Sequence, residues 1–363
     1  MPQESSVLIR PMVPEEMHLV HEVMRRSLPF FQRWFFAISH DVLVAEQFGR
    51  ILGAIVLKFI PLPERRRGGV LSSLFTDPDA RGRGVGRMLV DGGIHFLEKR
   101  GVEEILTCIE GNDDRMSNLL SSRGFSLLSS GQQFRRYGFG AFPVWLRISH
   151  YIDIGRFVWV RPSPEGERRA VAQRWWSITI NALLLLMALW SESGFTRMEP
   201  VVFLAIPLAC GVFFLLREEV MRRAASLYDL PVEFRMWESG FPASLIVAAA
   251  FGFWLPVPGS VYPAHAGWRY RELIPRLGRM AFAGSLAILL LTWGVVLTLR
   301  LLPHDPAVEY WLDSARVVGE WLTLFDIALP FFPYVSFNGR RIWDWSKPLW
   351  VCMALAAMGL FFV

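Results

Sequence analysis

The sequence contains few cysteines and few lysines for a chain of 363 residues. Cys108, Cys210 and Cys352 are too few and too far apart to form a disulfide framework or a cysteine-based zinc site. Nearly all of the 38 basic residues are arginines, and they do not gather on one soluble segment, so no nucleic-acid partner is expected. The N-terminus lacks the basic-then-apolar layout of a signal peptide, which favours a cytosolic first domain.

Charged residues are also scarce, whereas apolar residues are abundant. Only 20% of the chain is charged, 53% is apolar and the mean hydropathy is +0.32. This composition excludes intrinsic disorder and differs from that of a single soluble domain. Residues 1–150 carry charges throughout and alternate between strand-like and helix-like patterns, but the character of the chain changes after about residue 170. We therefore predict two domains of different kinds.

Six apolar stretches separated by short charged loops follow residue 170. They are Trp175–Trp190, Val201–Leu216, Phe241–Leu255, Ala281–Leu302, Val317–Val335 and Pro348–Val363. A helix needs roughly 20 apolar residues to cross a bilayer, and so many such stretches are not typical of core helices in a soluble protein. Loops on both sides of Phe241–Leu255 are rich in arginine, as cytoplasmic loops are, so this stretch is predicted to be re-entrant or interfacial.

The prediction is therefore an integral, multi-pass membrane protein with its first domain in the cytoplasm. Residues 1–150 form an α/β domain and residues 151–174 a basic linker. Residues 175–363 form an all-α domain in the lipid bilayer, with about five spans and one re-entrant segment.

A glycine-rich segment follows a predicted strand in the first domain. The strand ends near Thr76, glycines stand at positions 82, 84 and 86, and an amphipathic helix continues to about Lys99. Such a turn offers free backbone N–H groups and the positive end of a helix dipole, which together bind phosphate or pyrophosphate. The alternative is a tight turn that needs glycine for its conformation alone. A Rossmann site is not favoured, because this loop follows the fourth strand and lacks the acidic residue at the second strand end.

The motif Arg81-x-x-Gly84-x-Gly86 after a strand and a proline-containing turn resembles the acetyl-CoA loop of the GNAT acetyltransferase superfamily. The resemblance covers about residues 5–140 and implies a mixed central sheet with flanking helices. It also implies acetyl-CoA as the acetyl donor and an amine of a peptide, protein or small molecule as acceptor. The residues that it assigns to the cofactor are Arg81, Gly82, Arg83, Gly84, Val85, Gly86 and Arg87 for the pyrophosphate, Leu74, Phe75 and Thr76 for the pantetheine arm, and Asn112 beside that arm.

The catalytic residues implied by this resemblance are less well defined. Family members often place a tyrosine on the helix before a Gly-Phe ending, where it protonates the leaving thiolate, but this chain has Leu119 and Leu120 there. Glu46 and Glu110, at predicted strand ends, are candidates for the base, although each is otherwise explained as a solvated surface carboxylate. Two functions stay open: a membrane-anchored N-acetyltransferase, and a non-catalytic acyl-CoA-binding sensor or scaffold.

The second domain resembles site-2-type intramembrane metalloproteases over roughly residues 175–363. The segments that carry this resemblance are Glu233–Trp237, Pro256–Tyr262 and Phe337–Trp343. Such enzymes bind zinc through two histidines one helical turn apart and a later aspartate, with a glutamate base beside the first histidine.

The positions that the protease resemblance assigns to zinc ligands lack the required side chains. Arg217 and Met221 stand at the histidine positions, Glu218 at the base and Asn338 at the aspartate. No bound metal and no protease activity are expected. Asp326 lies within a predicted span, where a carboxylate needs a partner, so we expect Arg217 to neutralise Glu218 or Asp326. The alternative is that Arg217 extends to the membrane interface and Asp326 lines a wet crevice.

Overall fold

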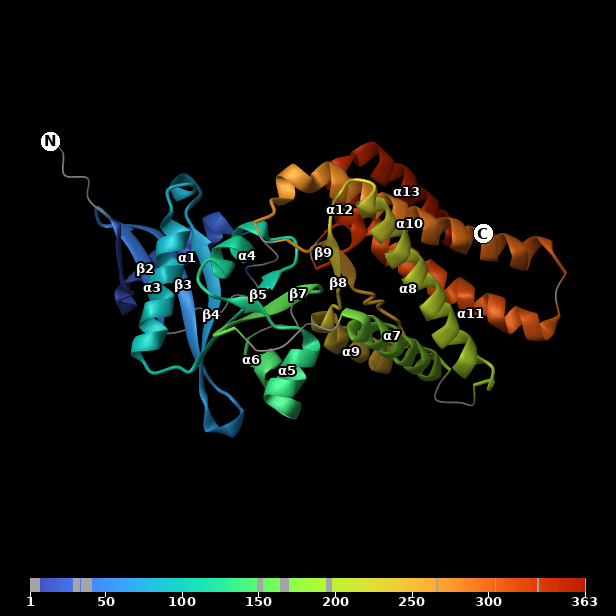
Figure 1. The fold of residues 1–363 in the computed structure, drawn as a ribbon, viewed down its shortest axis with the longest axis horizontal. Coiled ribbons are helices and arrows are strands. Elements are labelled where there is room, and N and C mark those ends of the chain that lie inside the picture. Colours follow the sequence, from blue (N-terminus) through green and yellow to red (C-terminus); the bar gives the residue numbers. More distant parts are fainter. Residues whose placement is uncertain are drawn as a thin grey trace.

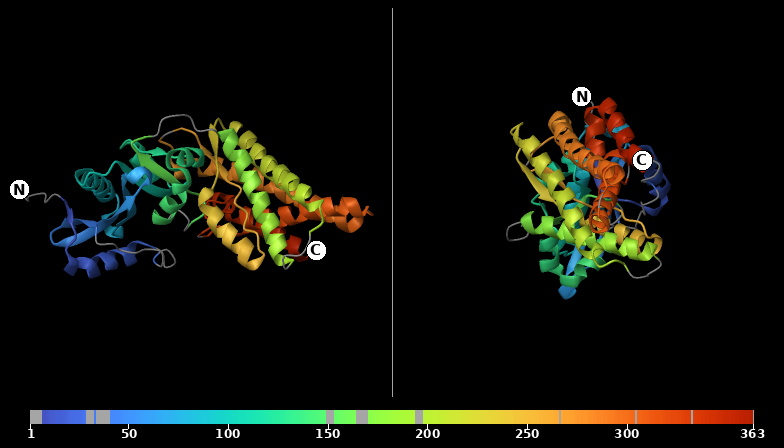
Figure 2. Two further views of the ribbon diagram at one scale, coloured as in Figure 1. Left: turned by 90° about the horizontal axis from the view of Figure 1, so that it is seen from below. Right: turned by 90° about the vertical axis from the view of Figure 1, so that its right-hand side faces the viewer.

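The computed structural model describes residues 7–28, 33, 41–148, 153–163, 170–193, 198–265, 267–303, 305–331 and 333–362. Figure 1 shows a part built on a β-sheet, coloured blue to green, beside a helical part, coloured light green to red. The two parts follow one another along the longest axis of the molecule, and the left view in Figure 2 shows the same arrangement. The division into two domains of different kinds matches the change in composition along the chain.

The first part contains a seven-stranded sheet with the order β1-β2-β3-β4-β5-β7-β6. The strands are β1 (Leu8–Pro11), β2 (Val42–Gln47), β3 (Arg50–Pro61), β4 (Arg67–Thr76), β5 (Glu104–Glu110), β6 (Ser126–Leu127) and β7 (Arg156–Arg161). Neighbouring strands are antiparallel except β4 and β5, which are parallel. The predicted mixed sheet is therefore confirmed.

Strand β7 lies inside the segment predicted to be a basic linker, residues 151–174. It pairs with β5 from Ile105 opposite Arg161 to Glu110 opposite Arg156, so it belongs to the sheet. The predicted boundary at residue 150 is thus too early. An unpaired β5 would leave a row of buried backbone donors and acceptors without partners, and β7 supplies them. Residues 164–169 of the predicted linker lie outside the described residues.

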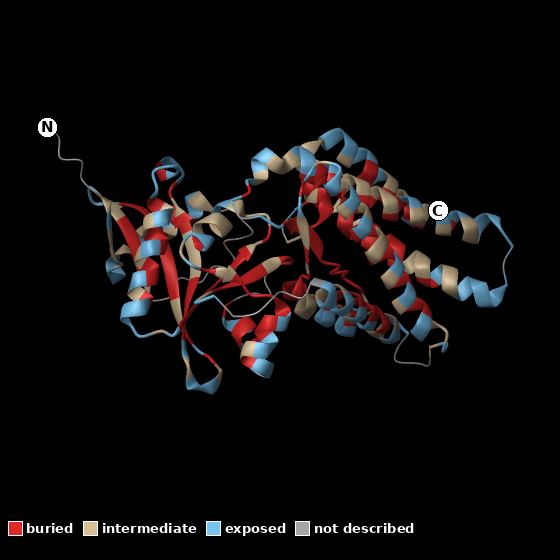
Figure 3. Cartoon of the chain, viewed as in Figure 1, coloured by how far each residue is buried: buried red, intermediate tan, exposed pale blue. Residues whose placement is uncertain are grey.

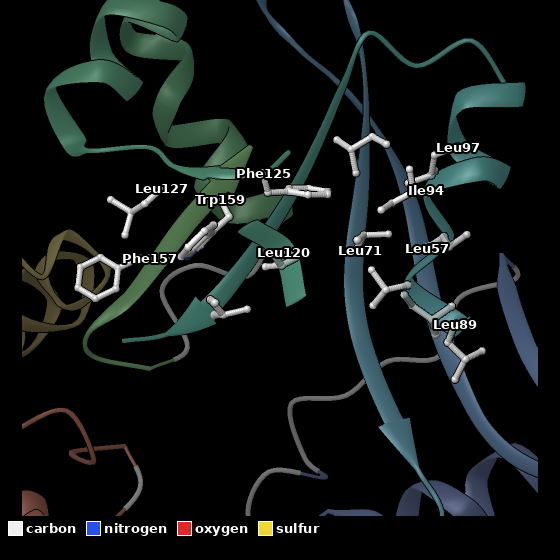
Figure 4. Packing of buried hydrophobic residues seen from close by; sticks show 14 of the residues in the cluster. Leu57, Leu71, Leu89, Ile94, Leu97, Leu120, Phe125, Leu127, Phe157 and Trp159 are labelled. Atoms are coloured by element: carbon white, nitrogen blue, oxygen red, sulfur yellow. The ribbon is translucent and has the colours of Figure 1, made fainter. Parts of the chain in front are cut away.

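Helices cover the sheet and supply its core. They are α1 (Met17–Ser27), α3 (Val85–Lys99), α4 (Asp114–Ser121), α5 (Ser130–Tyr137) and α6 (Ala141–Arg147). Helix α3 ends at Lys99, as its amphipathic pattern predicts, and it turns Leu89, Ile94 and Leu97 toward Leu57 and Leu71 of the sheet (Figure 4). This packing fixes the N-terminus of α3 at the end of β4.

The second part consists of helices and one small two-stranded sheet. The elements are α7 (Ala170–Glu192), α8 (Val202–Ser226), β8 (Val232–Arg235), α9 (Phe241–Phe251), β9 (Ser260–Pro263), α10 (Tyr270–Leu301), α11 (Pro306–Thr323), α12 (Asn338–Trp345) and α13 (Lys347–Gly359). A π-helical turn, Leu324–Ala328, continues α11. Each of the six predicted apolar stretches contributes a helix, and the stretch expected to be re-entrant forms the 11-residue α9.

Within the described residues, one helix, α10, is both long and apolar enough to cross a membrane. Helices α9 and α13 are apolar but shorter. The outward faces of the helical part nevertheless carry exposed large apolar side chains, including Leu183, Leu204, Leu208, Leu290 and Leu355. Figure 3 shows pale blue, exposed stretches along the helices of this part, between tan and red ones. The five spans remain a prediction.

The two parts share one hydrophobic core. Phe157 and Trp159 of β7 belong to the same buried cluster as Trp237, Tyr262 and Phe337 of the helical part. Hydrogen bonds cross the same boundary: the Gln133 amide donates to Glu238 at 2.8 Å, and the backbone N–H of Gly155 donates to the Ser239 hydroxyl at 3.0 Å. The helical part is therefore packed against the sheet and is not joined to it only by a linker.

Candidate functional site

The turn between β4 and α3 is anchored by a buried carboxylate. Asp77 accepts a hydrogen bond from the Asp79 backbone N–H at 3.0 Å and forms ion pairs with Arg26 and Arg50 at 3.0 and 3.1 Å. Burial alone would raise the pKa of Asp77, but the Asp79 amide and the two arginines together hold it below its usual value. The ionised Asp77 thus fixes the path of the chain from Thr76 into the glycine-rich loop.

The three glycines of the loop are required for two different reasons. Gly82 and Gly84 have φ values of +80° and +79°, and a Cβ at either position would meet no atom within 4 Å. Glycine there serves the left-handed backbone conformation. Gly86 has a helical conformation, and a Cβ would lie 3.7 Å from Leu74 and 3.8 Å from Thr76. The backbone conformation therefore does not require a glycine at position 86. Gly86 faces the space beside the end of β4.

A cavity of about 310 Å³ lies at this loop. Its lining residues are Thr76, Ala80, Arg81, Gly82, Gly84, Val85, Gly86 and Arg115. The backbone N–H groups in the first turn of α3 have no acceptor within the helix, and the helix dipole places positive charge there. Arg81 and Arg115 add two guanidinium groups. The cavity therefore fits a phosphate or pyrophosphate group.

Sequence reasoning identified most of this lining but missed two residues, Ala80 in the turn after β4 and Arg115. Arg115 lies in the first turn of α4, the helix that follows β5, and only the tertiary fold brings it beside the loop. The available signal was a basic residue at the start of that helix. Arg83 and Arg87, which were expected to hold the pyrophosphate, are exposed and do not line the cavity.

The edge of β4 beside this cavity is open toward β5. The parallel pairing of the two strands ends at Leu71 opposite Thr107, whereas β4 continues to Thr76 and β5 to Glu110. On its other side β4 stays paired with β3, where a register shift next to Val56 marks a bulge. Over the described residues, the two parallel strands thus separate like a wedge next to the cavity. An extended ligand arm can pair with the free edge at 74–76, although the Phe75 side chain is buried and only Thr76 lines the cavity.

Glu110 lies at the end of β5 on the far side of this wedge. Its side chain is half-buried, so it is not the solvated surface carboxylate of the alternative interpretation. Burial, reinforced by the negative charge of Asp113, raises the pKa of Glu110 to about 7, while Arg156 and the arginines of α12 act in the opposite direction. A carboxylate with this pKa can accept a proton near neutral pH.

Glu46, the other candidate base, is committed to an ion pair. Its carboxylate accepts a hydrogen bond from Arg10 at 2.6 Å, and Arg10 also binds Glu16. Strand β2, which carries Glu46, is separated from β4 by β3. The structure therefore does not bring Glu46 together with Glu110, and it accounts for Glu46 as a partner of Arg10.

Asn112 contacts the helical part and does not line the loop cavity. Its side-chain oxygen accepts a hydrogen bond from Arg341 at 3.1 Å, and its amide donates to the Val335 carbonyl at 3.5 Å. The position expected for a catalytic tyrosine is apolar in space as well as in sequence, because Leu119 is half-buried and Leu120 is fully buried.

The positions that the protease resemblance assigned to zinc ligands converge in the helical part. Arg217 donates two hydrogen bonds to Asp326, at 2.7 and 3.1 Å, and both side chains are buried. The Asn338 amide donates to Asp326 at 2.9 Å and lies 3.5 Å from the Met221 sulfur. The expected neutralisation of Asp326 by Arg217 is confirmed, while Glu218 is paired with other arginines.

The described residues contain no group of three or more His, Cys, Asp or Glu side chains that could hold a metal ion. The Arg217 guanidinium supplies the positive charge at this point, and the Asn338 amide and the Ser285 hydroxyl, at 2.9 and 2.7 Å, also donate to Asp326. The arrangement satisfies a buried carboxylate with donors from neighbouring elements.

Comparison with known proteins relates the two parts of the chain to different proteins. Residues 11–125 match the Acetyltransferase (GNAT) family. The mycothiol acetyltransferase of Propionibacterium freudenreichii is 35% identical over 118 residues, which are 32% of this chain and 36% of that protein. A protein of Methanocaldococcus jannaschii that carries the name of a zinc metalloprotease is 25% identical over 182 residues, 50% of this chain and 90% of its own length.

Among solved structures, the ribosomal-protein-S18-alanine N-acetyltransferase of Escherichia coli aligns with 17% identity and a TM-score of 0.32. It covers 45% of this chain and 99% of its own. The GNAT family N-acetyltransferase YhbS of Escherichia coli, solved with CoA, aligns with 23% identity and a TM-score of 0.29, over 35% of this chain and 72% of its own. The chain thus spans about a third of the length of the mycothiol acetyltransferase but most of that of the other relative.

Proposed function

We propose, from the match of residues 11–125 to the GNAT acetyltransferase family, that the chain transfers an acetyl group from acetyl-CoA to an amine. The observation that carries this proposal is the 310 Å³ cavity at the N-terminus of α3. This cavity is lined by the first-turn amides, the positive end of the helix, Arg81 and Arg115. These hydrogen-bond donors and positive charges match the negative charge of the CoA pyrophosphate. Acetyl-CoA is the acetyl donor, and the acceptor is an amine of a peptide, a protein or a small molecule.

The chemistry forms a carbon–nitrogen bond, breaks a carbon–sulfur bond and removes a proton from the nitrogen. Acetyl-CoA supplies an activated thioester when bound in the wedge between β4 and β5. The acceptor nitrogen bonds to the carbonyl carbon, the carbon–sulfur bond breaks, and its electron pair leaves on sulfur as a thiolate, which solvent protonates. The proton that the nitrogen loses goes to the Glu110 carboxylate, whose pKa near 7 suits this role.

The helical part anchors the enzyme in a lipid bilayer in this proposal, with the acetyltransferase domain on the cytoplasmic side. Support comes from α10, from the exposed apolar side chains of the other helices and from the arginine-rich loops. Arg217 and Asn338 at Asp326 support a protease-like scaffold that does not act as a protease. Zinc found in stoichiometric amount by elemental analysis of the purified protein would contradict this assignment.

A second candidate function is acyl-CoA binding without turnover. The observation that favours it is the pair Leu119 and Leu120 at the position of the usual tyrosine acid. A thiol-release assay with a panel of primary amines separates the two functions, because only the enzyme releases CoA faster in the presence of amine than by hydrolysis. Amine-dependent release supports acetyl transfer, and binding without release supports the sensor.

The cavity is tested by a matched pair of glycine substitutions. Gly86 and Gly131 are each the second residue of a helix, α3 and α5, and neither has a positive φ. A valine at 86 would place its side chain in the cavity, whereas a Cβ at 131 meets nothing within 4 Å. We expect Gly86→Val to weaken acetyl-CoA binding at least about tenfold in calorimetry, which is about 1.4 kcal/mol, and Gly131→Val to leave it unchanged.

Equal acetyl-CoA affinities for Gly86→Val, Gly131→Val and the parent protein would rule out this cavity as the cofactor site. Thermal unfolding of both variants serves as the control, since the two substitutions carry a similar cost for a β-branched residue in a helix.

A further inference from the structure

A second cavity, of about 190 Å³, lies where the sheet meets the helical part. The sheet side contributes the end of β5 with Glu110, together with Phe157 and Trp159 of β7. The helical side contributes β8 and the segment after β9, including Glu233 and Trp268. Figure 1 shows β8 and β9 next to β5 and β7, although the two pairs of strands are far apart in the sequence. Neither part could enclose this cavity alone.

The Glu110 carboxylate in the lining has no hydrogen-bond partner among the described residues. Its side chain is half-buried, and hydrogen-bond donors or a positive charge beside it would stabilise its ionised form. A bound molecule with hydrogen-bond donors would supply such a partner. Sites for drug-sized ligands occupy roughly 300–1,000 Å³, so this cavity has room for the end of a molecule only.

The walls of the cavity indicate the charge of that molecule. Phe125, Trp159 and Trp268 present aromatic surfaces, and Figure 4 shows the first two close together on the sheet side. Of the two carboxylates in the lining, Glu233 is paired with Arg235, which leaves Glu110, and the imidazole of His265 belongs to the lining as well. Aromatic rings and carboxylates together are the surroundings that bind an ammonium group.

Arg235, the arginine in the lining, does not reverse the preference of the cavity for a positively charged group. The Arg235 guanidinium is bound to Glu233 at 2.6 Å and lies over the rings of Phe157 and Tyr262, at 5.6 and 5.2 Å from their centres. Its charge is therefore already balanced by Glu233. Glu110 remains as the acidic group without such a partner among the described residues.

We propose that this cavity receives the amine-bearing end of the acceptor, so that the helical part builds one wall of the acceptor site. The inference rests on the proposed acetyltransferase function and extends it to the substrate class: a primary amine on an apolar stem. Glu110 lines the cavity at the end of β5, next to the wedge that opens toward the cofactor cavity. The same carboxylate thus binds the amine and accepts its proton.

Helix α4 connects the two cavities. Arg115 in its first turn lines the cofactor cavity, and Asn118, one turn later, lines the acceptor cavity. The Asn118 side chain donates to the Trp268 carbonyl at 2.9 Å and accepts from the Gly267 backbone N–H at 3.1 Å. Asn118 therefore holds the segment from the helical part over the acceptor cavity, at a fixed distance from the cofactor loop.

Charge-selective labelling of a cysteine in the cavity tests the proposal in the full chain. Cys108 and Cys210 are buried, so Cys352→Ser removes the exposed thiol. In this background Ser117→Cys places a thiol at a position of α4 that lines the cavity, and Ser122→Cys places one at the exposed C-terminal end of the same helix as a control. The reagents are the cationic aminoethyl and the anionic sulfonatoethyl methanethiosulfonates, and the measured quantity is the ratio of their reaction rates.

We expect the cation-to-anion ratio at position 117 to exceed that at position 122 at least tenfold, and Glu110→Gln to remove most of this excess. n-Hexylamine at millimolar concentration should slow labelling at 117 and leave 122 unaffected. Equal ratios at the two positions, or no labelling at 117 by either reagent, would overturn the proposal. A thermal shift with acetyl-CoA, measured on the same samples, reports separately on the proposed function. Acetyl-CoA binding without charge-selective labelling would contradict the acceptor site alone. Charge-selective labelling without acetyl-CoA binding would contradict the acetyl transfer alone.

Discussion

At the scale of single residues, two glutamates of similar sequence context have different surroundings in the fold. Glu46 and Glu110 both lie near the ends of strands. Glu46 finds Arg10 within 2.6 Å, whereas Glu110 is half-buried near Asp113 and has no hydrogen-bond donor among the described residues. An ion pair stabilises the charged form of a carboxylate, and burial beside another acid destabilises it. Only Glu110 is therefore suited to gain a proton near neutral pH.

This difference predicts the pH dependence of acetyl transfer. The raised pKa of Glu110, about 7, means that the carboxylate is protonated and inactive as a base at pH 6, and ionised and active at pH 8. We expect the rate to rise with pH through about 7, and Glu110→Gln to lower kcat about 100-fold or more and to remove this rise. The measurement is a pH profile of kcat with a saturating amine.

Glu46→Gln is the control for this experiment. It removes one partner of Arg10, so a small loss of stability is expected while the pH profile of the parent is kept. A pH profile that is identical in the Glu110→Gln variant and the parent would mean that another group accepts the proton.

At the scale of elements, α8 and the π-helical turn after α11 are joined by a buried ion pair. Arg217 on α8 and Asp326 on the turn are both almost fully buried, and their contact is bidentate. Removing one partner leaves an uncompensated buried charge, at a cost of about 3–5 kcal/mol. Arg217→Met should therefore reduce the folded yield in detergent and lower the melting temperature.

Arg223→Met on the same helix provides the comparison. Arg223 pairs with Glu219 one turn away, and both side chains are more than half exposed, so its loss should cost well under about 1 kcal/mol. If the Arg217→Met variant melts at the temperature of the Arg223→Met variant, the pair with Asp326 is not holding these elements together.

The elements themselves show which features the sequence could predict. The end of β4, the glycine turn and the helix to Lys99 depend on local patterns, and the structure has them where expected. The Arg217–Asp326 contact was predictable because a carboxylate in an apolar stretch requires a cation. The hydrogen-bond partner of Asn112 was not predictable, because Arg341 lies 229 residues away and only the tertiary fold brings the two together. The same holds for β7, whose place in the sheet depends on pairing with β5.

At the scale of the whole molecule, the shared core makes the two parts depend on each other for stability. Gly155 lies at the boundary with φ +81°, and a Cβ there would overlap the Ser336 hydroxyl. Gly101 has a similar φ of +71° on the surface, with no atom within 4 Å of an added Cβ. Both alanine substitutions carry the conformational cost of about 1–2 kcal/mol, and only the one at 155 also forces the two parts apart.

We therefore expect Gly155→Ala to be less stable than Gly101→Ala by about 1–3 kcal/mol. Unfolding of the sheet and of the helical part should remain one transition in both variants. Acetyl-CoA binding monitors the sheet, and tryptophan fluorescence monitors the whole molecule, because tryptophans lie in both parts. Equal stabilities would show that the boundary tolerates displacement and that the two parts are coupled less tightly than their contacts indicate.

Placement in a bilayer is the remaining property of the whole molecule, and α13 allows a direct test. Cys352 is an exposed thiol on this apolar helix, within a stretch predicted to span the membrane. A nitroxide label at Cys352 in proteoliposomes should be reached readily by oxygen and poorly by a water-soluble nickel complex, because lipid admits the first and excludes the second. The same label at Phe48→Cys, in the turn between β2 and β3 where the side chain is 83% exposed, should show the opposite preference. If both labels prefer the nickel complex, α13 lies in water, and the exposed apolar faces of the other helices would need a protein partner instead of lipid to cover them.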